Sequence, residues 1–438
     1  MERRVWDRVS AAGYLSVLAV TVVLERYANY LWFEQSILWG QSSNILLMFG
    51  GFGVAGILWL AAPWGTRATT ALRVFLIAMA LAWFVHWALY RIHGDAMNYT
   101  AAMYVPILVM LLVKPPKLAE ARIAVLALAW TTSVVLVLTR VLEMLRILSI
   151  RTQPEGIINF DEERYFLPLN DLMGIDGRWP GPFGHNGDTA MMGALLIVIA
   201  VAFWSRSSWV FLTVGAITLV LTNGRASIGA AVAGLVLIAM FSRSGRLDRI
   251  PRIFRIVGGS LVLVAGALFM FARPAGLTGR EKIWPAFLEL WWESPLVGVG
   301  GRGISNGNEV AQFYGHAHSL YIDELARWGL AGFVTQFAAI GVGVFIAARS
   351  AGRGYSGPLA VVVTYLITGI TEPRNNWVSP SATGFLLILM IVAAAAYLWE
   401  HPAERSSDQD EDSLRASVLP KTSGADNNPG DAKSGSLG

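Results

Sequence analysis

The chain has 438 residues, of which 55% are hydrophobic and 15% charged, and its mean hydropathy is +0.51. This balance lies far from that of soluble globular domains and predicts a membrane protein. The formal net charge is +4. We attribute the excess of basic residues to the topology of a membrane protein, so we expect no nucleic-acid partner. The number of cysteines is 0, which excludes disulfide bonds.

Apolar stretches of the length that crosses a bilayer recur along the chain. They cover roughly residues 11–24, 44–60, 71–90, 98–113, 121–142, 187–204, 208–221, 227–241, 256–271, 321–347, 359–371 and 382–399. Together they predict an all-α fold, a polytopic transmembrane helical bundle of about twelve spans. The first stretch follows the basic start MERRVWDR and has no small-residue cleavage site, so we expect it to remain as an anchor.

Lysines and arginines gather in alternate loops, at about residues 67–73, 114–122, 243–255 and 349–353. By the positive-inside rule, this pattern places both termini in the cytoplasm. Two long loops, 146–186 and 273–319, then face outward. Residues 1–399 are predicted to form one transmembrane domain. Residues 400–438, rich in Ser, Asp, Gly, Asn and Pro, are predicted to be a disordered cytoplasmic tail.

The first of four polar segments on the outward side is GRWPGPFGHNGDTAMMGAL, which begins at Gly177. It places Arg178, His185 and Asp188 at the outer rim of a span. The alternative is an ordinary loop whose helix is capped by Asn186 or Asp188.

The second segment is LTNGRASIG, in which Asn223 and Gly224 predict a tight turn. Arg225 then begins the next helix. An arginine at the outward end runs against the positive-inside bias, which marks it as a candidate functional residue. The alternative is an interfacial arginine that snorkels to the headgroups.

The third segment is GLTGREKIWPAFLELWWESPLVGVGGRGI. Its apolar, tryptophan-rich residues recur at helical spacing. They are Ile283, Trp284, Phe287, Leu288 and Trp291. The segment is therefore predicted to contain an interfacial helix along the membrane surface, with Arg280 at its mouth. For the tryptophans, plain interfacial anchoring is the alternative.

The fourth segment, GHAHSLYIDELARWGLAGF, carries His316 and His318. Alternate residues of an extended segment point the same way, so this pair has the spacing of half a metal site. Third ligands would have to come from His185, Asp188 or scattered acids. We therefore expect no metal.

Ser319 is a plausible N-cap for the helix that follows, which places His318 just before its first turn. The positive end of that helix and any nearby arginine are expected to lower the pKa of His318. A neutral imidazole is a competent general base. Asp323 and Glu324 are spaced to pair with Arg327, which would fix the helix.

These segments resemble, over about residues 178–399, the O-antigen ligase and polymerase family of bacterial membrane glycosyltransferases. GPFGHNGDTA is similar to the family's GxFxHPN segment and LTNGRAS to its TxSRG turn. GREKIWPAFLELWWESPLVGVG is similar to its GRxxxW…PxxGxG loop, and HSLYIDELARWGLAG to HNxxLxxLAExGxxG. The sequence departs from these patterns at Asn186 and Gly187, where the family has Pro-Asn, at Gly224, where it has Ser, and at Ser319, where it has Asn.

The resemblance implies transfer of a glycan from a polyprenyl-diphosphate-linked donor to a glycan, lipid or protein acceptor at the outer face of the cytoplasmic membrane. It implies that Arg225 and Arg280 bind the diphosphate and that His318 is the catalytic base. Arg178 and His185 are further candidate substrate-binding residues at the same rim. No cofactor is expected, because arginines would carry the diphosphate.

Other functions stay open. A polymerase would join lipid-linked repeat units and need a second diphosphate site, for which Arg178, Arg302 and Arg374 are available. A lipid-glycan or solute transporter would need ionisable residues near mid-span. His86 is the main candidate, although a hydrogen-bonded core histidine explains it as well. A structural scaffold would not need the outward arginines and histidines, and His316 has no assigned role.

Overall fold

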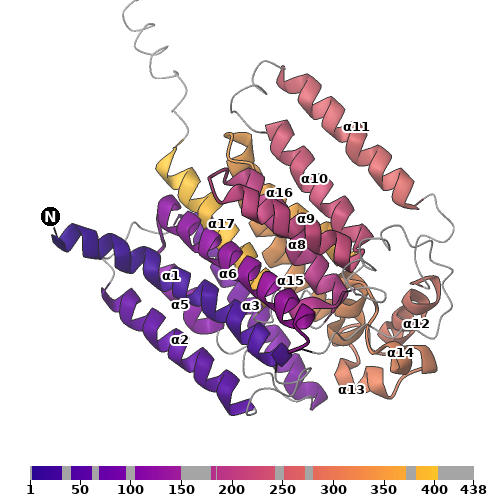
Figure 1. The fold of residues 1–438 in the computed structure, drawn as a ribbon. Helices are drawn as coiled ribbons and strands as arrows, with labels where there is room; N and C mark the ends of the chain where they lie inside the picture. Colours follow the sequence, from indigo (N-terminus) through magenta and orange to yellow (C-terminus); the bar gives the residue numbers. More distant parts are fainter. Residues whose placement is uncertain are drawn as a thin grey trace, which may run out of the picture. The chain divides into compact units, whose positions relative to one another are not determined.

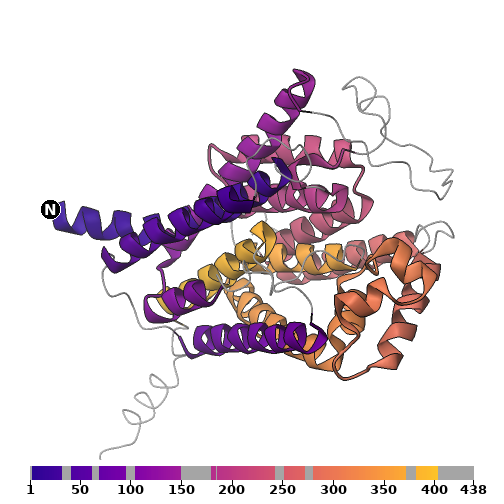
Figure 2. The same cartoon turned by 90° about the horizontal axis from the view of Figure 1, so that it is seen from below.

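The structure is a computed structural model that describes residues 2–31, 41–61, 69–94, 104–148, 179–183, 185–241, 251–271, 280–370 and 381–402. Within these ranges the chain is all-α, with fifteen α-helices, one 3-10 turn and no strand (Figures 1 and 2). The predicted all-α class is confirmed. Most residues of the predicted tail and of the predicted 146–186 loop lie outside the described ranges.

The helices of the first half are α1 (Glu2–Asn29), α2 (Gln41–Ala61), α3 (Thr70–His93), α5 (Tyr104–Val113), α6 (Leu118–Met144), the 3-10 turn η2 (Gly181–Phe183), α8 (Asn186–Ala202) and α9 (Ser208–Thr222). Those of the second half are α10 (Arg225–Phe241), α11 (Arg252–Phe271), α12 (Arg280–Glu293), α13 (Gly300–Ser305), α14 (Glu309–Tyr314), α15 (Leu320–Gly352), α16 (Gly357–Gly369) and α17 (Ala382–Glu400).

Four of these helices, α3, α6, α15 and α17, are long and apolar enough to cross a membrane. The helices α8, α9, α10 and α16 are also apolar but shorter. The chain is thus a multi-pass membrane protein, as its composition predicts.

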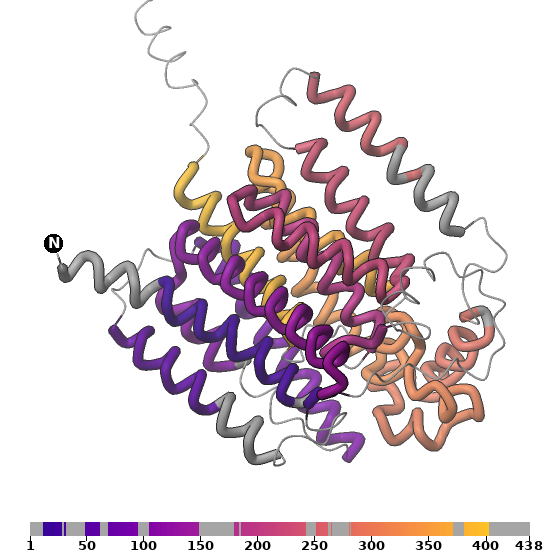
Figure 3. Tube along the Cα trace, viewed as in Figure 1, coloured from indigo at the N-terminus to yellow at the C-terminus, as the bar shows by residue number. Residues whose placement is uncertain are grey.

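The helix α17 lies at the centre of the bundle (yellow in Figure 3). Every residue from Ala382 to Ala396 is buried, and the helix packs against α1, α3, α6, α15 and α16. A helix that is apolar on all sides is expected in such a place. Helices farther out expose apolar side chains instead, as α3 does with Ile77, Leu81 and Phe84, and this is the surface that suits lipid.

The short helices α12, α13 and α14 form a separate group with the start of α15, which we call the loop module (Figure 1). Its apolar core contains Ile283, Phe287, Leu290, Ile304, Ala311, Ala317 and Ala326. Protein thus covers Ile283 and Phe287, which the sequence assigns to a face on the membrane surface. Trp292 is 69% exposed, and the placement of α12 on the membrane stays a prediction.

The helix α15 is broken near its start. Its 33 residues would span about 50 Å, more than the roughly 30 Å core of a bilayer. At Gly329 the backbone leaves the helical region, with φ 60° and ψ −165°. The part after the break, residues 330–352, has the length of one span, about 35 Å. The part before it, residues 320–328, belongs to the loop module.

Residues 295–299 of the loop module fill this break. They replace the missing helical hydrogen bonds: Leu330 N–H donates to Pro295 O at 2.9 Å, Ala331 N–H to Leu296 O at 3.0 Å, and Val299 N–H to Ala326 O at 2.9 Å. Backbone polar groups inside a membrane protein need such partners. The glycine-rich PLVGVG stretch and the WGLAG stretch are therefore two halves of one joint.

Candidate active site

The described part of the first polar segment begins at Trp179, which is buried and tied to two helices. Its indole Nε1 donates to Glu143 Oε2 of α6 at 2.9 Å, and its backbone N–H donates to Leu221 O of α9 at 3.0 Å. Glu143 is also paired with Arg140 at 3.1 Å. These bonds fix the start of the segment beside the α9–α10 turn. Arg178 lies just outside the described residues.

His185 is the N-cap of α8, a role that the sequence suggested for Asn186 or Asp188. Its Nδ1 accepts the N–H of Gly187 at 3.1 Å. Because Nδ1 accepts, a neutral His185 carries its proton on Nε2. Asp188 lies in the first turn of α8, where the partial positive charge of the helix end favours a carboxylate.

Arg26 joins this segment from α1, and sequence reasoning missed it. Its Nη2 lies 3.9 Å from Asp188 Oδ2 and donates to the carbonyl of Phe183 at 3.3 Å. An arginine at the end of the first apolar stretch that faces outward in the predicted topology runs against the positive-inside bias. The signal that singled out Arg225 therefore also existed for Arg26.

The α9–α10 turn packs directly on α8. Asn223 caps α9 in the left-handed conformation, with φ 48°, and Arg225 begins α10, both as predicted. A Cβ on Gly224 would lie 2.4 Å from the Cβ of Ala190, so only glycine allows this approach. The exposed Arg225 is thereby held near the start of α8.

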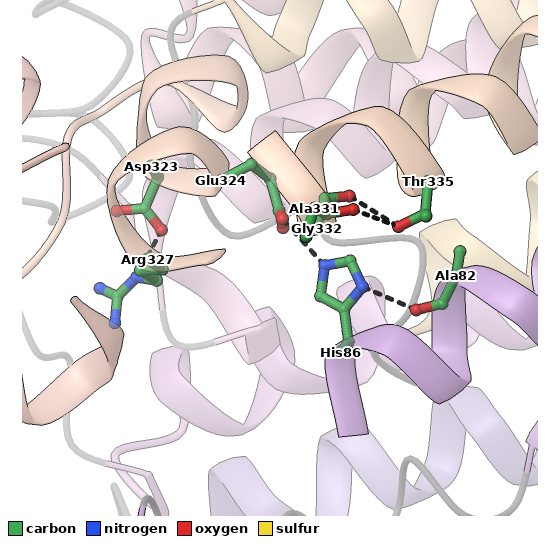
Figure 4. A network of polar contacts seen from close by, with 8 residues as sticks. All are labelled: Ala82, His86, Asp323, Glu324, Arg327, Ala331, Gly332 and Thr335. Carbon is green, nitrogen blue, oxygen red and sulfur yellow. Dashed lines mark hydrogen bonds and ion pairs between the residues drawn. The ribbon is translucent and has the colours of Figure 1, made fainter. Parts of the chain in front are cut away.

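The segment before α15 is held by a carboxylate and a guanidinium (Figure 4). Asp323 Oδ1 accepts the N–H of Ala317 at 3.1 Å, and Asp323 Oδ2 accepts from Arg327 Nε at 2.7 Å. Arg327 Nη2 also donates to the carbonyl of Gly315. The predicted Asp323–Arg327 pair is confirmed, and it clamps the backbone on both sides of His316.

His318 has a positive φ of 48°, which is uncommon for a residue with a side chain. The next residue, Ser319, is the N-cap of α15 as predicted, although its side chain makes no capping hydrogen bond. Backbone strain of this kind persists where the surroundings enforce it, and such sites are often functional. Here the Asp323–Arg327 clamp is one such constraint.

The structure brings histidines of the first and fourth segments together. The ring centroids of His316 and His318 are 4.2 Å apart, and those of His185 and His316 are 6.4 Å apart. Tyr314 lies 5.8 Å from His318 on the other side. His316 is thus the middle one of three histidines in a row that Tyr314 extends. Among the described residues, no group of three or more His, Asp or Glu has an arrangement suited to a metal ion.

The remaining candidate arginines are spread more widely. Arg280 is the first residue of α12. Arg302, on α13, is exposed, and its guanidinium lies beside Gly94, the C-cap of α3. Arg374 lies outside the described residues.

His86 is a buried, hydrogen-bonded core histidine, which confirms that explanation of it (Figure 4). Its Nδ1 donates to the carbonyl of Ala82 at 2.8 Å, since a carbonyl only accepts. Its Nε2 lies 3.0 Å from Glu324 Oε2. The expected pairing of Glu324 with Arg327 is therefore replaced by a bond to α3. His86 joins α3 to the segment of α15 that follows His318.

The apolar helices define a multi-pass membrane protein. Its histidines and arginines gather where several of these helices begin, which forms a polar site at helix ends. Residues 189–337 match the family described as O-antigen ligase. The match bears out the sequence resemblance over that range, and it supports a membrane glycosyltransferase-like role in polysaccharide biosynthesis. A comparison with curated proteins gave no match. The matched residues include Arg225, Arg280 and His318, whereas Arg26 and His185 precede them.

Proposed function

We propose that the protein transfers a glycan from a polyprenyl-diphosphate carrier to an acceptor hydroxyl on the outer side of the cytoplasmic membrane, as an O-antigen ligase-like enzyme. The acceptor is a glycan, a lipid or a protein. The proposed topology has about twelve spans, with both termini in the cytoplasm and the site facing outward.

In the proposed reaction, the acceptor oxygen attacks the anomeric carbon of the donor sugar. The bond from that carbon to the diphosphate breaks, and the polyprenyl diphosphate leaves with the electron pair. His318 takes the hydroxyl proton as general base. Arg225 and Arg280 bind the diphosphate and offset its charge, for which the planar guanidinium is well suited. Arg178 and His185 remain proposed substrate-binding residues at the rim.

The observation that supports this assignment best is the held conformation of the segment 315–318. Asp323 and Arg327 bind the backbone at Ala317 and Gly315, and His318 takes a left-handed conformation directly before α15. A base must be held within hydrogen-bond reach of the proton it removes.

The test is transfer by the purified, reconstituted protein with His318→Asn. Asparagine tolerates the left-handed conformation better than alanine does but cannot act as a base. We expect kcat to fall about a hundred- to ten-thousandfold, with an unchanged thermal midpoint. Retained turnover in this variant would remove His318 from the role of base.

Glycolipid analysis of a strain that lacks the protein distinguishes a ligase from a polymerase and from a transporter. Full-length glycan left on the carrier lipid is the result expected for a ligase. Loss of chain length would instead identify a polymerase. Unchanged glycan with carrier lipid retained on the inner leaflet would point to transport and overturn the proposed reaction.

A further inference from the structure

Arg26, in the last turn of α1, is a basic residue at the candidate site and lies far outside the matched residues 189–337. It contacts Phe183 at 3.3 Å and Asp188 at 3.9 Å. These two residues lie on either side of His185, whose ring is in the row with His316 and His318. Arg26 is therefore attached to the segment that carries one of the histidines.

The guanidinium of Arg26 is held and still accessible. Both contacts are made through Nη2, whereas an arginine has five N–H donors. The side chain of Arg26 is 42% exposed, in contrast to 13% for Asp188. A ligand can thus reach the guanidinium, while the carboxylate beneath it is largely covered.

The distance between the Arg26 guanidinium and the Asp188 carboxylate also affects whether Arg26 can bind an anion. At 3.9 Å the pair is longer than a charge-assisted hydrogen bond, which is about 2.7–2.9 Å. The guanidinium can therefore turn toward an anion without breaking a short bond. A buried carboxylate alone would repel a diphosphate, and Arg26 offsets that charge.

We propose that Arg26 is an additional substrate-binding residue, supplied by α1, that contacts the diphosphate of the donor, with Asp188 positioning it. This inference rests on the proposed function. It makes the site depend on a helix near the start of the chain as well as on the matched domain. The planar fork of the guanidinium, which binds two phosphate oxygens at once, is the chemistry involved.

The experiment measures binding of a sugar-free polyprenyl diphosphate to the full chain in lipid nanodiscs, so that it does not depend on transfer. Arg26→Gln should weaken binding by about ten- to a hundredfold, the range for hydrogen bonds to charged groups. Arg26→Lys should bind with intermediate affinity. The matched control is Arg91→Gln, on exposed α3 surface, which should bind as the unchanged protein does.

A double variant separates binding from simple charge compensation. If Arg26 only neutralises Asp188, then Arg26→Gln combined with Asp188→Asn should restore affinity, and the inference is overturned. Continued weak binding in the double variant supports a direct contact. If Arg26→Gln lowers the thermal midpoint too far for measurement, Arg26→Lys alone decides, and unchanged affinity in it refutes the paired contact.

The same assay distinguishes failure of this inference from failure of the proposed function. Loss of binding in Arg225→Gln together with normal binding in Arg26→Gln overturns only the inference. Normal binding in both Arg225→Gln and Arg280→Gln overturns diphosphate binding by the site itself. In transfer assays, Arg26→Gln should raise KM for the donor more than it lowers kcat.

Discussion

Gly298 occupies the joint between the loop module and the break in α15, and its substitution by alanine tests whether this joint is rigid. Its φ is 72°, in the left-handed region. An added Cβ would lie 2.3 Å from the backbone C and O atoms of Arg327 and 2.5 Å from the backbone N of Trp328. Backbone atoms of a bonded joint cannot move aside as the end of a flexible side chain can. The substitution should therefore force the two segments apart.

The magnitude follows from two costs. A left-handed conformation costs an alanine about 1–2 kcal/mol, and overpacking adds about 1–3 kcal/mol. Their sum is roughly 2–5 kcal/mol. An unfolding entropy of about 2.1 cal/mol/K per residue gives this 438-residue chain a shift of about 1 °C per kcal/mol, which predicts a fall in thermal midpoint of roughly 2–5 °C. Thermal unfolding of purified protein in one detergent measures this difference.

Two other glycines separate these costs. Gly315 has a φ of 66° but no atom within 4 Å of an added Cβ, so its alanine variant should show only the conformational cost of about 1–2 kcal/mol. Gly341 lies in a helix with open space around it, so its alanine variant should be neutral or more stable by up to about 1 kcal/mol. Equal midpoints for the variants of Gly298 and Gly315 would refute the reasoning, because they would mean that the joint yields.

Two further predictions concern the side chains that hold α15. Asp323→Asn offers one acceptor oxygen, whereas the N–H groups of Ala317 and Arg327 need two. We therefore expect kcat for transfer to fall about tenfold or more, with little change in KM for the donor. An equal effect on kcat and KM would contradict a positioning role for Asp323. Removing one partner of a buried pair costs about 3–5 kcal/mol, so Glu324→Ala should lower the thermal midpoint strongly. Glu324→Gln keeps a hydrogen-bond partner for His86 Nε2, because a glutamine amide can donate or accept, and should lower the midpoint less. Equal losses in the two variants would show that the hydrogen bond contributes little.

Local features of the site could be predicted from the sequence because neighbouring residues determine them. The Asn223–Gly224 turn, the helix start at Arg225 and the N-cap at Ser319 follow from backbone preferences within a few residues. The Asp323–Arg327 pair follows from helical spacing. The helical spacing of the apolar residues in α12 likewise predicted that one face of this helix is buried. That spacing carries no information on whether lipid or protein covers the face.

The contacts that assemble the site join residues far apart in the chain, so no local pattern contains them. Arg26 and Phe183 are 157 residues apart, and His86 and Glu324 are 238 residues apart. Sequence spacing paired Glu324 with Arg327, and helical geometry allows that pair. The bundle instead places α3 beside this face of α15, and a buried imidazole then competes with a more exposed guanidinium for the same carboxylate. Tertiary packing decides between partners that are equivalent on a helical wheel.

The same packing explains how the two halves of the proposed reaction support each other. The helices α8, α10 and α15 begin close together, since Gly224 lies against Ala190 and the ring of His185 lies near that of His316. Each helix start carries a partial positive charge of about half a unit. Such a field favours a bound diphosphate and offsets its charge as it leaves. In the proposed mechanism, the packing that gathers these helix starts therefore holds the leaving group beside the segment that carries the base, His318. An acidic residue in place of Arg225 would oppose binding of the diphosphate, whereas a residue that cannot take a proton in place of His318 would remove only the proposed base.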